Sequence, residues 1–342
     1  MSDLMKKMKF RLAISVTAAA SLLGCASTPT RPSSVARGDY DAAKEYVTRL
    51  IQHRMKAHSL VGLSIVLVDD QKVVWAEGFG HADKERNIPA TADTAYRVGS
   101  ISKLFTATAA MQLAEQGRMD IDKPLQTYLP AFSIKSRFPD SAPVTPRHLM
   151  THHSGLPGDV IRGMWNPNPE SFTGVVEKIR DEYTANPPGY VWAYSNVGVT
   201  LLGHAIQNVY GENFSTGMAR RVLRPLGMRD ASFSARPEGS QMARAYRDGV
   251  ASDDPPLRDV PAGGLNASAA DLGLFCRWCS PVVSPESTRF CALKPSRKCC
   301  VRRIPALCST GASRSGWPGC LAVWEISISA MPGRSLTVAA RP

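Results

Sequence analysis

A serine and a lysine three residues apart are the first candidates for chemistry in this sequence. Ser100 and Lys103 form an S-x-x-K within the stretch R-V-G-S-I-S-K. In a helix, this spacing places both side chains on one face, one turn apart. Serine needs a base to take its proton, and a lysine that is desolvated or lies near other cations can lose its own proton near neutral pH. A helix that begins at Ser100 would add N–H groups for a developing oxyanion, so the pair indicates nucleophilic catalysis.

The sequence around this pair predicts the elements that hold it. Apolar residues from 101 to 113 recur with the spacing of a mostly buried helix, and Gly117 is suited to end that helix. Residues 63–67 and 73–76 predict two strands, and the polar residues 69–72 predict a turn between them. A β-hairpin is therefore expected before the helix.

Several motifs accompany the S-x-x-K in a fixed order. They read V-W-A-E-G-F-G, Y-R-V-G-S-I-S-K, L-M-T-H-H-S-G-L-P, Y-S-N-V-G-V-T-L-L-G, P-L-G-M and P-A-G-G-L. Across residues 44–275 the chain resembles the serine β-lactamase and penicillin-binding protein superfamily, in the class C branch with related esterases and D-alanyl-D-alanine peptidases. Several motifs in the same order identify a family more specifically than any single motif does.

The resemblance implies a role for each matching residue. Ser100 is the nucleophile that becomes acylated, and Lys103 takes its proton or holds it deprotonated. Tyr194 lies beside both and relays a proton to the leaving group, and in class C relatives it also helps to activate the deacylating water. Asn196 hydrogen-bonds to Lys103 and to the amide of the substrate. The implied reaction is acyl transfer from an amide, β-lactam or ester carbonyl, followed by hydrolysis.

The resemblance also implies an α/β fold, of the α+β kind, in which an antiparallel sheet is flanked by helices and a mostly helical second lobe spans residues 118–190. Neither a metal nor an organic cofactor is needed for this reaction. His152 and His153 invite a metal or base interpretation, but no metal-ligand spacing surrounds them. The expected partner is a small molecule or a peptidoglycan-derived peptide.

The first residues predict export. Lys6, Lys7, Lys9 and Arg11 precede a short apolar run that ends in L-L-G-C at Cys25. This pattern is a signal peptide, too short to span a membrane. L-L-G-C resembles a bacterial lipobox, so residues 1–25 are interpreted as a lipoprotein signal with Cys25 as the lipidated residue.

A plain secretory signal cleaved nearby is the alternative, and the true start codon is left open between the first methionines. Ala26 and Ser27 follow the cysteine, with no aspartate to retain the protein at the inner membrane. Residues 26–43 are interpreted as a tether, and the expected location is the outer membrane, facing the periplasm.

The net charge is unevenly distributed. Residues 276–342 hold ten Lys or Arg and two Asp or Glu, a net charge of +8 out of the whole chain's +12. Most of the remainder lies in the signal peptide. The mature front portion is nearly neutral, so no nucleic-acid partner is expected.

The composition changes after Phe275. Seven of the eight cysteines lie at Cys276, Cys279, Cys291, Cys299, Cys300, Cys308 and Cys320. A disulfide or zinc module is one interpretation, although the spacing fits no zinc pattern and an odd number leaves one cysteine unpaired. The other interpretation is a frameshift, in which 44–275 is an incomplete hydrolase domain and 276–342 is a tail in the wrong frame.

Codons for residues 276–342 can be chosen so that the minus-one frame has no stop codon and no cysteine, and ends in H-R-G-G-A-T. That ending resembles the third active-site element of the family, H-x-G or K-T-G, which is missing after Tyr194 here. In relatives this element supplies one of two oxyanion N–H groups, a donor worth about 2.7–4 kcal/mol. The alternative to an active hydrolase is therefore a pseudoenzyme that binds cell-wall peptides, or an inactive product.

Overall fold

The computed structural model describes residues 28–36, 38–69, 71–235 and 242–279. The chain divides into two compact units, Met1–Leu60 and Val61–Pro342. In the first unit, helix α2 spans Tyr40–Ala57, and the side chain of its N-cap Asp39 accepts a hydrogen bond from the Ala42 N–H at 3.3 Å. Within the described part of the chain, no helix combines the length and hydropathy that a bilayer crossing requires.

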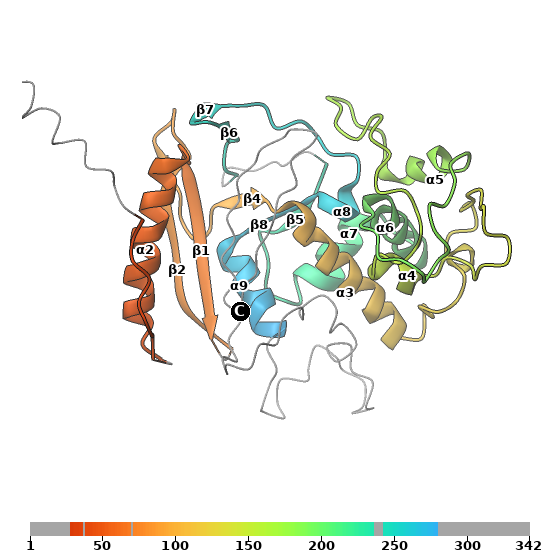
Figure 1. The fold of residues 1–342 in the computed structure, drawn as a ribbon, viewed down its shortest axis with the longest axis horizontal. Coiled ribbons are helices and arrows are strands. Elements are labelled where there is room, and N and C mark those ends of the chain that lie inside the picture. Colours follow the sequence, from red (N-terminus) through yellow and green to blue (C-terminus); the bar gives the residue numbers. More distant parts are fainter. Residues whose placement is uncertain (1–27, 37, 70, 236–241, 280–342) are drawn as a thin grey trace, which may run out of the picture. The chain divides into compact units, whose positions relative to one another are not determined.

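The second unit begins with the predicted hairpin (Figure 1). Strands β1 (Gly62–Asp69) and β2 (Lys72–Asp83) pair in antiparallel fashion, with Asp69 opposite Lys72 at the turn. Strand β3 (Ile88–Pro89) adds to β2. The hairpin prediction is confirmed, and β2 extends seven residues beyond the predicted strand because it continues to pair with β1 and then with β3.

A second small antiparallel sheet has the order β4-β8-β5. Its strands are β4 (Ala95–Arg97), β8 (Leu265–Ser268) and β5 (Ser232–Phe233), and a separate pair consists of β6 (Tyr246–Arg247) and β7 (Val250–Ala251). Strand β4 leads directly into the S-x-x-K segment. The pairing of β4 with β8 therefore brings P-A-G-G-L, just before β8, next to that segment.

Helix α9 (Ala269–Cys279) packs against β1 and β2 and also against helix α3 (Ser102–Glu115). Its Gly273 allows the close approach, because a Cβ there would lie 2.8 Å from Val66 Cγ2 of β1. On the other side, the ring of Phe275 stacks on that of Phe105, with centroids 4.2 Å apart. The hairpin and the helix that follows Ser100 thus share α9 as a common neighbour.

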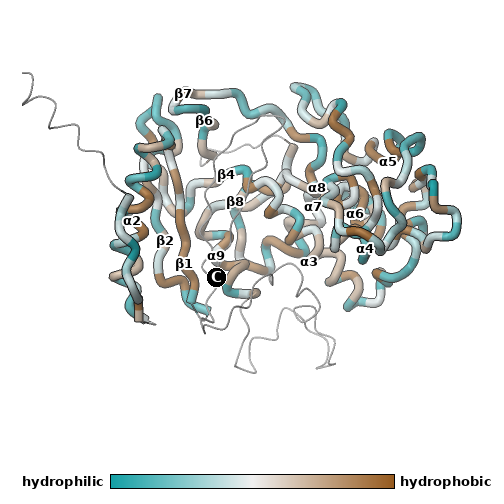
Figure 2. The backbone as a smooth tube through the Cα atoms, viewed as in Figure 1, coloured by the Kyte–Doolittle hydropathy of each residue, from teal (hydrophilic) through white to brown (hydrophobic). Residues whose placement is uncertain are grey.

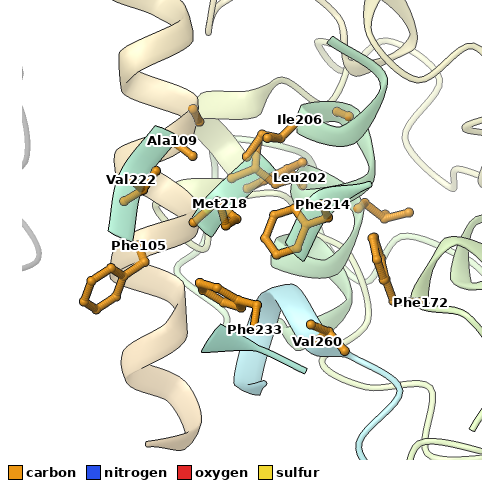
Figure 3. Packing of buried hydrophobic residues seen from close by; sticks show 14 of the residues in the cluster. Phe105, Ala109, Phe172, Leu202, Ile206, Phe214, Met218, Val222, Phe233 and Val260 are labelled. Atoms are coloured by element: carbon orange, nitrogen blue, oxygen red, sulfur yellow. The ribbon is translucent and has the colours of Figure 1, made fainter. Parts of the chain in front are cut away.

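The main core surrounds α3 and helix α6 (Asn196–Tyr210), as Figure 3 shows. Helix α3 is buried on all sides, as its apolar sequence predicts, and Gly117 follows its C-cap with a left-handed φ of 69°. Phe214 of helix α7 (Phe214–Met218) contacts Phe172 and Phe233 edge-on. Figure 2 shows hydrophobic residues along β1 and in α6. Helix α3, which begins just after Ser100, is therefore anchored in the main core.

Residues 118–190 contain less helix than predicted. The described elements there are short: η3 (Leu125–Thr127), α4 (Pro146–Met150), η4 (Phe172–Gly174) and α5 (Val175–Lys178). The physical reason is the proline content, since prolines recur through the segment and each lacks an N–H and disfavours a helix in the residue before it. The segment is mainly loops that cover one side of α6.

Helix α9 runs through the position where the frameshift is predicted. Residues 276–279 continue the helix, and Cys276 packs against the cluster of Val66, Val68 and Ala269. Residues 280–342 and the signal peptide, Cys25 included, lie outside the described residues. The predictions for the tail and for lipidation stay predictions.

Candidate active site

The structure brings the three predicted catalytic side chains together. Ser100 lies in the 3₁₀ turn η2 (Gly99–Ile101), one residue before α3 begins. Lys103 Nζ lies 3.0 Å from Ser100 Oγ, and the Tyr194 hydroxyl, 94 residues away in sequence, donates to the same Oγ at 2.7 Å. The one-turn spacing of S-x-x-K therefore places base and nucleophile in hydrogen-bond contact.

Burial prepares Lys103 to act as a base. Its side chain is 9% exposed, and burial lowers its pKa from 10.5 to about 7, although the nearby carboxylates of Asp159 and Asp259 act in the opposite direction. Nζ also donates to the Ala262 carbonyl at 2.8 Å and lies 4.8 Å from the centre of the Tyr194 ring. Near neutral pH a substantial fraction of Lys103 is thus unprotonated and can accept the serine proton.

The carbonyl that orients Lys103 belongs to helix α8 (Val260–Gly263). This helix is held close to α6, because Gly203 leaves no room for a side chain: a Cβ there would lie 2.3 Å from Pro261. On the opposite side, Thr106 Oγ1 of α3 donates to the Pro261 carbonyl at 2.8 Å. The P-A-G-G-L motif thus positions Lys103 through the Ala262 carbonyl, a role that the sequence did not predict.

Tyr194 is held by the loop that contains the two histidines. The imidazole of His152 lies 4.5 Å from the Tyr194 ring, centre to centre, and its Nδ1 accepts from the Ser195 N–H at 3.2 Å. Burial lowers the pKa of His152 to about 4, helped by Lys103 and His153, so the ring is neutral. His152 is therefore a support for Tyr194 rather than a base. Across the described residues, no three His, Cys, Asp or Glu side chains gather as a metal site.

The protonation state of Tyr194 follows from its surroundings. Burial raises the pKa of Tyr194 above 10, the hydrogen bond with Ser100 opposes this shift, and Asp159 adds to it. The hydroxyl therefore stays protonated at neutral pH and is available as a donor. This state suits the predicted role of passing a proton to a leaving group.

Asn196 is the first residue of α6, two residues after Tyr194, and makes a different contact from the one that the resemblance implies. Its Nδ2 donates to Asp159 Oδ1 at 2.7 Å. The hydrogen bonds of Lys103 Nζ within the described residues go to Ser100 and Ala262. The amide Nδ2 and the Lys103 ammonium are both donors, so Nδ2 pairs with the carboxylate oxygen instead. Asp159 was not predicted as a site residue, although it follows the L-M-T-H-H-S-G-L-P motif with only Gly158 between them.

A buried ion pair holds the residue that follows Asp159. The side chain of Arg258 is fully buried, and its Nε donates to Asp259 Oδ1 at 2.6 Å. The remaining guanidinium nitrogens donate to the carbonyls of Arg162 and Val160 at 3.0 and 2.8 Å. Arg258 thereby fixes the loop after Asp159 to the start of α8. Nothing in the sequence marked this pair, because neighbouring residues of opposite charge are common on surfaces.

Removal of Arg258 is expected to destabilise the protein strongly. Arg258→Met leaves the Asp259 carboxylate buried without a counter-charge, which typically costs about 3–5 kcal/mol. The double variant Arg258→Met/Asp259→Leu removes both charges and should recover part of that loss. Urea unfolding followed by tryptophan fluorescence measures both. A single variant as stable as the wild type would show that the pair does not hold the loop.

Comparisons with known proteins agree with this geometry. The family model described as "Beta-lactamase" matches residues 47–291, more than half of the chain, and the chain therefore belongs to the β-lactamase family. Members of this family are serine hydrolases. The family assignment and the mixed α/β fold confirm the predictions made from the motifs.

Individual relatives share about a quarter to a third of their residues with this chain. The penicillin-binding protein homologue from Pyrococcus abyssi is 31% identical, with a TM-score of 0.60, over 69% of this chain and 56% of its own. The D-alanine carboxypeptidase AmpC from Burkholderia cenocepacia is 26% identical, with a TM-score of 0.60, over 73% and 68%. Protein flp of Staphylococcus aureus (strain N315) is 28% identical over 193 residues, 56% of this chain and 38% of that protein. The chain thus spans about two fifths of the length of this curated relative.

Proposed function

We propose that this chain is a serine hydrolase that forms an acyl-enzyme at Ser100 from a β-lactam, ester or D-alanyl peptide carbonyl. The observation that carries the proposal is the contact of Ser100 Oγ with both Lys103 Nζ, at 3.0 Å, and the Tyr194 hydroxyl, at 2.7 Å. A nucleophile, a base with a pKa of about 7 and a protonated donor meet at one oxygen atom.

The geometry supports a balanced sequence of proton transfers. Unprotonated Lys103 accepts the Ser100 proton as Oγ forms a bond to the substrate carbonyl carbon. When the tetrahedral intermediate collapses, the bond to the leaving group breaks, Tyr194 gives that group its proton, and the Lys103 ammonium restores the proton of Tyr194. In the second half of the reaction, water attacks the carbonyl of the acyl-Ser100 ester. The proton transfers then run in reverse and return the proton to Ser100 Oγ.

A substrate panel tests the proposal. The full chain is incubated with a p-nitrophenyl ester, a chromogenic cephalosporin and a D-alanyl-D-alanine peptide, and Tyr194→Phe is compared in parallel. Turnover of at least one substrate, reduced by about 10²- to 10⁴-fold in Tyr194→Phe, is the expected result. If no substrate forms product and none acylates Ser100, the chain is not a hydrolase.

A pseudoenzyme is the second candidate, and a specific observation favours it. The sequence contains no H-x-G or K-T-G after Tyr194, so the family's third active-site element is missing from the chain. Sequencing the gene across the codons for residues 274–277 separates the candidates. The frameshift interpretation requires one T to have been lost near the codon for Phe275. A sequence with one more T there restores the frame that ends in H-R-G-G-A-T and favours an intact hydrolase. Confirmation of the present frame makes the pseudoenzyme the leading candidate.

The cell envelope is the proposed location. The basic segment, the apolar run and the L-L-G-C ending at Cys25 support lipid attachment and an outer-membrane position facing the periplasm. Incorporation of a labelled fatty acid into the wild type, and its loss in Cys25→Ser, is the corresponding test.

A further inference from the structure

An unpaired carboxylate lies beside the catalytic side chains. Asp159 is exposed, and its Oδ1 accepts from Asn196 Nδ2 at 2.7 Å. Among the described residues, Asp159 takes part in no ion pair, in contrast to the carboxylates of Asp254 and Asp259, each of which has an arginine. The second carboxylate oxygen of Asp159 is thus available to a group that approaches from solvent.

Hydrogen bonds on both sides hold this carboxylate in place. Ahead of it, the Gly158 carbonyl accepts from the first two N–H groups of α6, at 2.8 and 3.2 Å, and the Pro157 carbonyl accepts from Ser195 Oγ at 2.7 Å. After it, the Val160 carbonyl accepts from buried Arg258 at 2.8 Å. The position of Asp159 is therefore fixed by the same helix that carries Asn196, which is the arrangement of a built subsite rather than of a mobile loop residue.

The charge of Asp159 reaches the reacting groups. It raises the pKa of Lys103 and that of Tyr194, and these two side chains both contact Ser100 Oγ. Any substrate acylating Ser100 must place its carbonyl carbon at this point. A positive charge on the adjacent part of the substrate would therefore be attracted by Asp159, and a negative charge would be repelled.

An exposed aromatic ring is linked to Tyr194 through His152. Trp192 is 60% exposed, and its ring meets the His152 ring edge-on at 6.0 Å, while His152 stacks on Tyr194. Exposed aromatic rings attract quaternary and primary ammonium groups through their faces. A carboxylate that acts on Lys103 and Tyr194, and an exposed indole linked to Tyr194 through His152, suit a cation better than an anion.

We propose that Asp159, presented by Asn196, forms a subsite that selects substrates whose acyl group carries a positively charged ammonium. This inference rests on the proposed function, because it assigns the substrate class of the same Ser100 site. The Asp159 carboxylate distinguishes this site from a site that selects anionic acyl groups.

Two isosteric esters test the charge preference. One is p-nitrophenyl 4-(trimethylammonio)butanoate, and the other is p-nitrophenyl 5,5-dimethylhexanoate, which has carbon in place of the charged nitrogen. The full chain should show about a fivefold higher kcat/KM for the cationic ester at low salt, as expected for one exposed charge pair. The preference should fall in 1 M NaCl, because exposed charges are screened.

Asp159→Asn provides the matched variant, since the amide oxygen still accepts from Asn196 but carries no charge. The ratio of the two kcat/KM values should fall to about one. A general effect on Lys103 changes both esters equally and leaves this ratio unaltered. Asp140→Asn, which removes an exposed carboxylate from the loop before α4, is the control and should keep the wild-type ratio.

Binding to Ser100→Ala separates the subsite from the chemistry. Calorimetric titration with the same two esters gives a ratio of Kd values that needs no turnover. Preferred binding of the cationic ester, abolished by adding Asp159→Asn, supports the subsite even if the wild type hydrolyses neither ester. The hydrolase proposal is decided separately, by the substrate panel. Equal binding of the two esters, or no binding of either, overturns the subsite, whatever the wild type hydrolyses.

Discussion

Ser100→Ala is expected to lower the rate of ester or lactam hydrolysis by about 10⁴-fold or more, the loss typical of a removed serine nucleophile. The Oγ of Ser100 is the atom that both Lys103 and Tyr194 contact, and no other hydroxyl is shared by this pair within the described residues. The initial rate with a p-nitrophenyl ester measures the effect, and circular dichroism verifies that the variant is folded.

Ser133→Ala serves as the control, since it removes an exposed hydroxyl from a loop of the same unit and should retain full activity. A Ser100→Ala variant with more than a tenth of the wild-type rate would exclude Ser100 as the nucleophile. Loss of activity in both variants would instead indicate a general sensitivity of the fold.

Lys103→Met is expected to lower activity strongly and yet to stabilise the protein at or below neutral pH. Methionine has a similar length and no charge. The loss of the base should reduce turnover by about 10²- to 10⁴-fold. The wild-type rate should rise as the pH increases through about 7, because only unprotonated Lys103 accepts the serine proton.

The stability effect has a defined sign. Lys103 has a folded-state pKa of about 7 against 10.5 as its ordinary value, so the unfolded chain binds more protons between these pH values. The free energy of unfolding should therefore rise with pH from about 7 to 10.5, and the full cost of the buried lysine is present below pH 7. Each pKa unit corresponds to about 1.4 kcal/mol, partly offset in the variant by the lost hydrogen bonds to Ser100 and Ala262.

Urea unfolding of wild type and Lys103→Met across pH 5–10 tests this account. The difference in the free energy of unfolding should favour the variant most at low pH and shrink as the pH rises. Two parallel pH profiles would mean that Lys103 has an ordinary pKa, and the case for Lys103 as the base would fail.

The Ser100–Lys103 pair was predictable from a local signal, whereas the role of Tyr194 was implied by the resemblance to the family. The S-x-x-K spacing is set by one helical turn, and Y-S-N spans the start of an apolar helix whose N-cap, Ser195, accepts from the Gly198 N–H at 2.8 Å. The hairpin was predictable for a similar reason, since apolar residues flank a polar turn. These features depend on residues within a few positions of one another.

Asp159, Ala262 and Arg258 were not predictable as parts of the site. Their roles depend on contacts between segments about 40 to 160 residues apart, such as Lys103 with Ala262 and Arg258 with Val160. Helix content at 118–190 was overestimated, because the apolar residues there are buried by loops that prolines interrupt rather than by helices. The two-residue strands β5 and β6 are too short to leave a periodic pattern.

Covalent labelling shows directly whether Ser100 is the nucleophile that becomes acylated. The full chain is treated with a fluorescent penicillin or a fluorophosphonate, and the adduct is located by peptide mass spectrometry. We expect one adduct per chain, on the peptide containing Ser100, with none in Ser100→Ala and a slower reaction in Lys103→Met. An adduct on another residue, or a chain that neither reagent modifies, would contradict it.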